Sequence, residues 1–211
     1  MKYDETSLPE KVKEYLEEIY NDEELSDAFY DCDVEILSED AIIDMEEDGS
    51  WLDDLMGPEE SRNSTYEDIK PFAMDATGAV WVVLNDELIA YIGTEGECGI
   101  VARNIDDFMN ITAIGNCCPD YRVDYLKSEE DFLKAFSKTE DDENFEVLDK
   151  FIEKHGFTKD PKELYKMIIA GLTVKPFFEI KATDDEYCDS YSILGSDDGQ
   201  EELERLIELL K

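Results

Sequence analysis

The chain has 211 residues and carries 57 acidic against 19 basic residues, a formal net charge of −38. Phosphate backbones and anionic membrane surfaces repel such a chain, which argues against direct nucleic-acid binding and against membrane binding. Leu, Ile, Val and Phe still number 54, about 26%, above the roughly 20% typical of disordered chains, so we expect a folded protein with an acidic surface.

The termini and the cysteines indicate a cytoplasmic protein. The opening MKYDETSLPE has no apolar signal core, and no apolar run approaches the ~18 residues needed to span a bilayer. The five cysteines are odd in number, include the adjacent pair Cys117-Cys118 and form no CxxC motif, so reduced thiols are expected. His155 is the only histidine, which excludes a site built on several histidines.

The first 60 residues hold 23 acids against Lys2, Lys11 and Lys13, a net charge of −20. Hydrophobic spacing there predicts, in chain order, a helix beginning at Pro9, a second acidic helix around 25–29, a short strand over 33–37, a helix over 40–47, an apolar cluster over 51–56 and a surface loop over 58–67. The N-terminal third is therefore predicted to be mostly helical and strongly acidic.

The clearest strands follow. Apolar runs over 69–74, 79–84, 88–93 and 99–102 are joined by short polar turns, which predicts an antiparallel meander over residues 69–102. Asn104 is placed to cap the next helix and Gly115 to end it.

The second half is predicted to be mostly helical. Helices are expected after Ser128, over 143–154, over 161–170 with Gly171 at the end, and over 200–210; a second hairpin is expected near 174–194, from strands 174–182 and 187–194. The whole pattern predicts an α+β fold with a central antiparallel sheet flanked by helices.

No motif for catalysis, a cofactor or a metal stands out. Asp44, Glu46 and Asp48 resemble the start of a calcium loop, but Leu55 occupies the twelfth position, where a bidentate Glu is required. Acidic pairs such as Asp106-Asp107 occur by chance in so acidic a chain. His155, followed by Gly156, is best placed to complement a helix dipole.

Trp81 lies in an all-apolar run and is expected in the core; the same position is favoured for Trp51, with a binding anchor as the alternative. Partner-binding residues are sought among acids expected at the surface and Trp51. The predicted set comprises Asp22, Glu23 and Glu24 on the second helix, Trp51 as an aromatic anchor, Asp86 and Glu87 in one turn of the meander, and Glu95 and Glu97 in the next.

Residues 69–112 resemble the central segment of the SUKH superfamily. The "pfA-x-D-x-x-G" strand and turn of that family is matched by Pro71-Phe72-Ala73 with Asp75 and Gly78. Two apolar strands and a turn from Gly93 to Gly99 follow, and the strand-to-helix step is matched by Val101-Ala102-Arg103-Asn104-Ile105-Asp106-Asp107-Phe108. Residues 120–211 are an extension not typical of this family.

The superfamily includes bacterial immunity proteins and relatives of the yeast cell-wall assembly regulator. The resemblance implies a single α+β domain over 1–211 and a non-enzymatic role: binding and neutralising a cognate toxin, often a nuclease. The charge agrees, because a nuclease is basic where it grips its substrate and an acidic partner is steered to that face.

Three alternatives stay open. An acidic nucleic-acid mimic would bind a host or phage DNA-binding protein. A hydrolase would show a cleft with two inward acids and a raised pKa. A scaffold or regulator with an unspecified partner would share the acidic surface.

Overall fold

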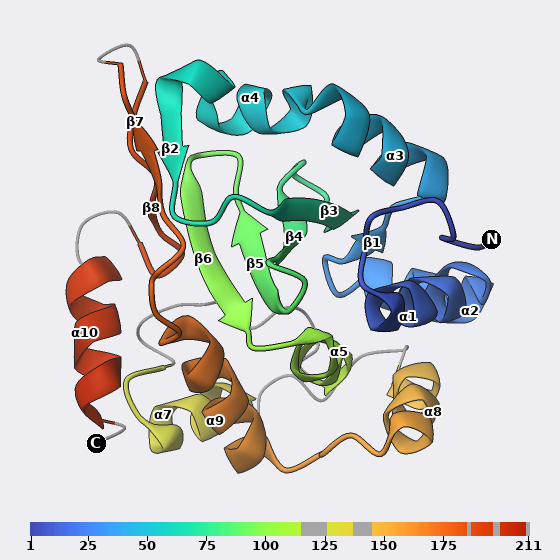
Figure 1. The fold of residues 1–211 in the computed structure, drawn as a ribbon. Coiled ribbons are helices and arrows are strands. Elements are labelled where there is room, and N and C mark those ends of the chain that lie inside the picture. Colours follow the sequence, from blue (N-terminus) through green and yellow to red (C-terminus); the bar gives the residue numbers. More distant parts are fainter. Residues whose placement is uncertain (115–125, 137–144, 185–186, 196–198, 210–211) are drawn as a thin grey trace.

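The protein is described here by a computed structural model, covering residues 1–114, 126–136, 145–184, 187–195 and 199–209. Gly115, predicted to end a helix, and the Cys117-Cys118 pair lie outside these residues. The fold is α+β, as predicted: a mostly antiparallel sheet with helices packed around it (Figure 1).

The meander predicted over 69–102 is confirmed. Its strands are β3 (Ile69–Met74), β4 (Val80–Leu84), β5 (Leu88–Ile92) and β6 (Glu97–Ala102). Each pairs antiparallel with the next. Within the described residues the sheet has six strands, because β1 (Glu35–Ile36) adds antiparallel beside β3 and β8 (Tyr191–Ser192) adds parallel beside β6.

One carboxylate organises the β3–β4 turn. Asp75 Oδ1 accepts from the backbone N–H of Thr77 at 2.8 Å and of Ala79 at 3.0 Å, and Asp75 Oδ2 accepts from the Tyr91 hydroxyl at 2.9 Å. Gly78 has φ +94°, a conformation that a residue with a Cβ rarely adopts. The Asp75 and Gly78 positions of the sequence motif therefore have a structural explanation in this turn.

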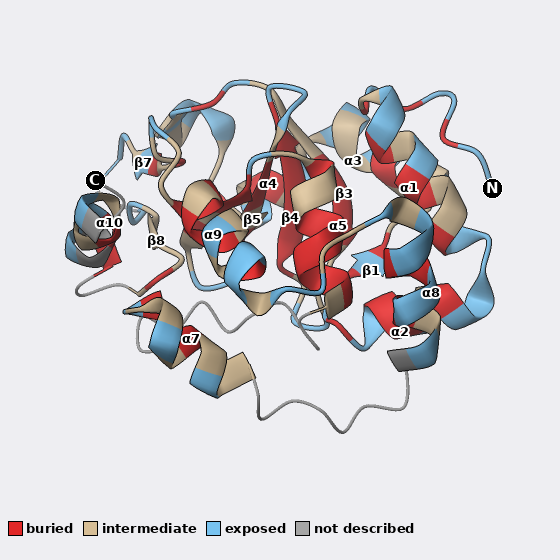
Figure 2. Ribbon diagram, turned by 90° about the horizontal axis from the view of Figure 1, so that it is seen from below, coloured by how far each residue is buried: buried red, intermediate tan, exposed pale blue. Residues whose placement is uncertain are grey.

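The sheet separates two hydrophobic cores, and both faces of β4 are buried. Trp81 lies in the larger core, 2% exposed, and donates its indole N–H to Asp33 O at 3.1 Å. Its predicted core position is confirmed. The smaller core holds Val82, Leu84 and Ile92 with Phe178. Figure 2 shows this burial concentrated on the central strands and on the helix faces turned toward them.

The helices pack their apolar faces against these cores. They are α1 (Glu10–Tyr20), α2 (Glu23–Tyr30), α3 (Glu39–Asp48), α4 (Ser50–Met56), α5 (Ile105–Ile114), α7 (Glu129–Phe136), α8 (Phe145–His155), α9 (Pro161–Leu172) and α10 (Gly199–Leu209). The capping roles expected of Asn104 and Ser128 are confirmed, since each side chain accepts from the backbone N–H three residues on. Ser38 caps α3 in the same way. Pro9 is the N-cap of α1 rather than its first residue.

The strands of the predicted second hairpin are present but pair elsewhere. β7 (Ile180–Ala182) pairs antiparallel with β2 (Arg62–Ser64), and β8 pairs with β6. Between the two segments, Ser190 Oγ and the Asp189 carboxylate accept from the backbone N–H groups of Ile180 and Ala182, both at 2.8 Å. These side chains therefore occupy backbone N–H groups that would pair with the opposite strand in a regular hairpin.

Two smaller expectations were wrong. The predicted surface loop over 58–67 contains a 3₁₀ turn, Glu59–Ser61, followed by β2. Gly171 does not end α9 but lies inside it, where a Cβ would come within 2.3 Å of Val101 O on β6. The glycine is required by the close approach of helix and strand, a tertiary contact that turn statistics do not register.

Candidate functional site

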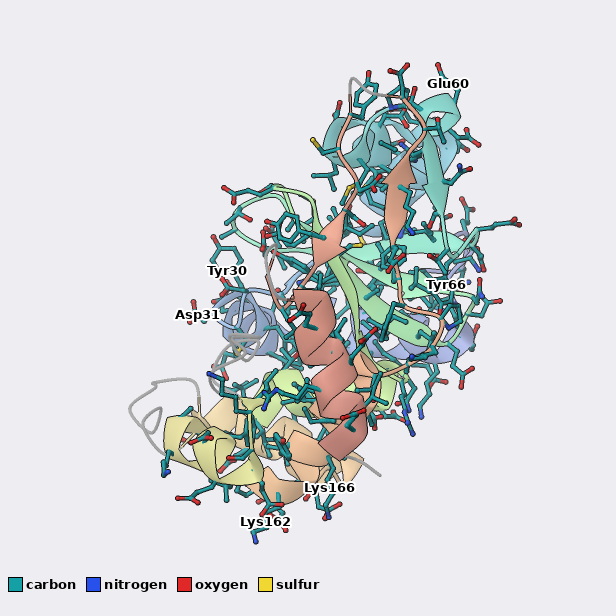
Figure 3. All side chains as sticks on the ribbon, turned by 90° about the vertical axis from the view of Figure 1, so that its left-hand side faces the viewer. Tyr30, Asp31, Glu60, Tyr66, Lys162 and Lys166 are labelled. Carbon is teal, nitrogen blue, oxygen red and sulfur yellow. The ribbon has the colours of Figure 1, made fainter. Side chains whose placement is uncertain are left out.

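The predicted acids on α2 divide into a structural one and exposed ones. Asp22 is the N-cap of the helix, and its Oδ1 accepts from Leu25 N at 3.2 Å. Glu23, Glu24 and Asp27 are exposed, and Tyr30, at 52%, is the most exposed large hydrophobic residue among those described. Figure 3 shows Tyr30 at the outer edge of the molecule. We call Glu23, Glu24, Asp27 and Tyr30 the α2 surface.

The acids of the β4–β5 turn are partly neutralised. Asn85 and Asp86 have positive φ, as a tight hairpin turn requires. Asp86 is paired with Lys70, whose ammonium also lies 3.1 Å from Asp68 Oδ2. Burial acts to lower the pKa of Lys70, but the hydrogen bonds with Asp86 and Asp68 outweigh it and raise that pKa. Glu87 is exposed.

The acids of the β5–β6 turn lie at the other end of β5. Glu97 Oε2 accepts from Glu95 N at 3.2 Å and lies 3.4 Å from the Tyr191 hydroxyl, so this side chain closes its own turn. Five strand residues span about 17 Å, which separates these acids from Asp86 and Glu87. The predicted contact residues therefore do not form one continuous surface.

Trp51 lies on α4 and is half-buried against the smaller core. Its position agrees with packing in the core, and its partial exposure leaves part of the residue accessible.

A polar groove that the sequence did not predict lies between α1, α5 and the connection from α8 to α9. Its volume is about 620 Å³, within the usual range for ligand sites. Lys11, Glu14, Tyr15 and Glu18 line it from one face of α1, because positions three and four apart stack along a helix. The opposite wall is formed by Asp106, Asp107, Asn110, His155, Phe157 and Met167.

Asp106 and Asp107 have opposite electrostatic environments in this groove. Burial alone acts to raise the pKa of Asp106, but hydrogen bonds from Lys11 and from the Tyr15 hydroxyl, at 2.6 Å for Tyr15, bring it below the ordinary value. Burial and the neighbouring Asp106 charge raise the pKa of Asp107.

This pair bears on the hydrolase alternative. Consecutive helix residues point about 100° apart, whereas a hydrolytic carboxyl pair faces the substrate from two sides. In addition, Asp106 is occupied by Lys11 and Tyr15. Asp107 has the raised pKa expected of a hydrolase acid, but Asp106 and Asp107 do not form a pair of carboxylates that face each other.

His155 ends α8 as predicted, followed by Gly156 at φ +68°. Its Nε2 lies 3.0 Å from Glu18 Oε2, and Glu18 Oε1 lies 2.8 Å from Lys154 Nζ. The imidazole stacks on Phe157 with ring centroids 5.4 Å apart, and lies 5.0 Å from Tyr15. The single histidine thus joins α8 to α1.

Asn110 holds the α8–α9 connection in place. Its amide donates to Thr158 O at 3.0 Å and accepts from Thr158 N at 3.1 Å, and the residue is 2% exposed. Both ends of the amide are used, so the Asn110-Ile111-Thr112 sequon is a structural element in the folded protein.

A second cavity, of about 280 Å³, lies beside β6 and contains Cys98. Cys98 Sγ is 3.2 Å from Phe178 O and 3.1 Å from Ser190 Oγ. Burial raises the pKa of this thiol to about 11, so it is protonated at neutral pH and is a poor nucleophile.

Metal and membrane sites were also sought. Within the described ranges, no three His, Cys, Asp or Glu side chains meet in a group that would hold a metal ion. Asp44, Glu46 and Asp48 lie on helix α3 rather than in a loop. None of the helices in the described part of the chain combines the length and apolar content that crossing a bilayer requires.

No family model, curated protein or solved structure matches this chain.

Proposed function

We propose that this chain is a non-enzymatic, immunity-type protein that binds a basic, nuclease-like toxin domain and occludes its active face. The observation that carries the proposal is the concentration of acidic residues in the folded N-terminal region. Residues 1–60 have a net charge of −20, and α1 buries Val12, Tyr15, Leu16 and Ile19 while Glu10 and Glu14 are exposed.

A fixed acidic surface is suited to this role for two reasons. Its long-range field steers a basic partner and raises the association rate by about 10- to 1,000-fold. Its carboxylates also occupy the same basic groups that the toxin uses for its phosphate substrate, so substrate and immunity protein compete. The α2 surface combines three exposed acids, Glu23, Glu24 and Asp27, with an exposed tyrosine, a residue type enriched at binding hot spots.

The test begins with partner capture. The tagged protein is incubated with a lysate of its native cells at low salt, and bound proteins are released by a salt step and identified by mass spectrometry. The released protein is then expressed alone and together with this chain.

A single basic effector whose toxicity is relieved by co-expression is the expected result. Recovery of restriction or chromatin proteins without a toxic effector would favour the nucleic-acid mimic. A captured effector whose toxicity is unchanged by co-expression contradicts the immunity role.

A further inference from the structure

The groove between α1, α5 and the α8–α9 connection is strongly anionic. Four carboxylates line it, Glu14 and Glu18 from α1 and Asp106 and Asp107 from α5, against Lys11 and His155. Low-dielectric walls around such a set concentrate its field and attract cations.

Two of these carboxylates already hold basic side chains. Asp106 is paired with Lys11, and Glu18 with Lys154 and His155. The fold thus uses the groove to receive ammonium and imidazole groups. These internal pairs show which chemistry the groove accepts.

The other two carboxylates make no ion pair with the described residues. Glu14 is exposed, whereas Asp107 is half-buried; burial and the charge of Asp106 raise the pKa of Asp107, and Arg103 and the Asn104 side chain offset this only in part. A half-buried carboxylate beside a like charge is poorly stabilised, and an added cation relieves both effects.

Two apolar side chains, Phe157 and Met167, also line the groove. The His155 ring stacks on Phe157 at an interplanar angle of 26°. A guanidinium group fits this combination better than an ammonium, because it stacks on ring faces and presents a planar fork of donors to carboxylates.

We propose that this groove binds an arginine side chain of the basic partner, paired with Asp107 and Glu14 and lying against Phe157. The inference rests on the proposed function for the source of the arginine. The volume of about 620 Å³ accommodates a side chain with its flanking backbone.

The test uses the only histidine of the chain as a local reporter. The ring resonances of His155 are followed by NMR while the intact protein is titrated with acetyl-Gly-Arg-Gly-amide. The matched control is the citrulline peptide, which has the same shape but no charge. Peptide bound elsewhere on the acidic surface does not contact His155, so the signal is specific to the groove.

We expect the arginine peptide to shift the His155 resonances saturably and the citrulline peptide to leave them unmoved. Asp107→Asn is expected to weaken the apparent affinity about tenfold, the loss of a charge-assisted hydrogen bond. Glu14→Gln is expected to weaken it less, and Glu14→Lys to abolish it. The matched control, Glu23→Gln with Glu24→Gln, removes two charges outside the groove and is expected to change the affinity less than twofold.

Equal shifts with both peptides, or unchanged affinity in Glu14→Lys, would overturn the inference. Because Glu14 is exposed, its variants are expected to keep the fold, so their affinities report on the groove alone. The measurement needs no partner protein. A negative result would therefore reject the arginine site in the groove, while the proposed function is tested separately by the capture of a basic effector.

Discussion

The acids of the α2 surface and those of the groove are the same residue types in opposite situations. On α2, Glu23, Glu24 and Asp27 are exposed on a short helix. In the groove, Asp106 and Glu18 are engaged by Lys11, Tyr15, Lys154 and His155, and they connect helices far apart in the sequence. Acidic residues thus supply the surface charge in one region and tertiary contacts in the other.

The difference shows why a net charge of −38 is compatible with a compact fold. Exposed charges are screened by salt and solvent and add little to the free energy of unfolding individually. Paired, half-buried charges are few and fix the positions of helices. Variants that separate the two groups test this division.

The largest stability effect is expected from Tyr15→Ala. Tyr15 is 5% exposed, and its ring lies 6.1 Å from that of Phe151 and 5.0 Å from that of His155. Removing it leaves a cavity and should lower the free energy of unfolding by about 3–5 kcal/mol. Tyr30→Ala, on the α2 surface, is the matched control and should change it by less than about 0.5 kcal/mol. Urea denaturation measures the free energy of unfolding of both variants. Similar losses would contradict the distinction between the groove and the α2 surface.

Asn110→Ala should come next. The change removes both hydrogen bonds that hold Thr158, at 3.0 and 3.1 Å, and leaves its half-buried backbone N–H and C=O without these partners. We expect a loss of about 2 kcal/mol, measured by urea denaturation, with faster amide hydrogen exchange confined to the α8–α9 connection. Uniformly faster exchange throughout the protein would contradict a local role.

Asp106 and Asp107 should contribute to the free energy of unfolding with opposite dependence on pH. The lowered pKa of Asp106 stabilises the fold above the ordinary pKa of 3.8, and this contribution is lost as the pH falls through the lower folded value. Asp106→Asn should therefore lose about 1 kcal/mol at pH 7, allowing for partial exposure.

The raised pKa of Asp107 favours folding below the ordinary pKa of 3.8, and this advantage disappears as the pH rises through the folded value. Asp107→Asn should therefore be more stable than the parent protein at pH 7, and the gap should close below pH 3.8. Thermal unfolding from pH 3 to 7 checks both variants. If both were stabilised or both destabilised at pH 7, the electrostatic environments assigned to Asp106 and Asp107 would be contradicted.

The smallest effect on stability is expected on the α2 surface. Replacing Glu23 and Glu24 by Gln should leave the free energy of unfolding within about 0.5 kcal/mol of the parent. Association with the captured partner should slow about two- to fivefold, because rim charges act on the encounter rate. Stopped-flow kinetics measures the association rate. An unchanged rate would indicate that α2 does not belong to the interface.

The sequence predicted the local features of this molecule well. The meander over 69–102, the caps at Asn104 and Ser128 and the core position of Trp81 all follow from short-range patterns. What it did not predict depends on distant contacts. β7 was assigned to a hairpin because its true partner, β2, lies in a segment with loop-like composition. Gly171 was read as a terminator because its contact with Val101 is not local.

The groove was missed for the same reason. The acidic pair Asp106-Asp107 has many equivalents in so acidic a chain, and His155 has a simple local explanation at the end of a helix. The contacts that make them a site run from α1 to α5 and from α1 to α8, across as many as 137 residues of sequence. The i, i+3, i+4, i+7 spacing of Lys11, Glu14, Tyr15 and Glu18 was the one available signal.

The central claim is that acidic charge drives recognition of a basic partner. The most direct test is the association rate of the captured partner, measured by stopped flow from about 50 mM to about 500 mM salt. The account predicts a fall of at least about tenfold, with a much smaller change in the dissociation rate. An association rate that does not change across this range would contradict it.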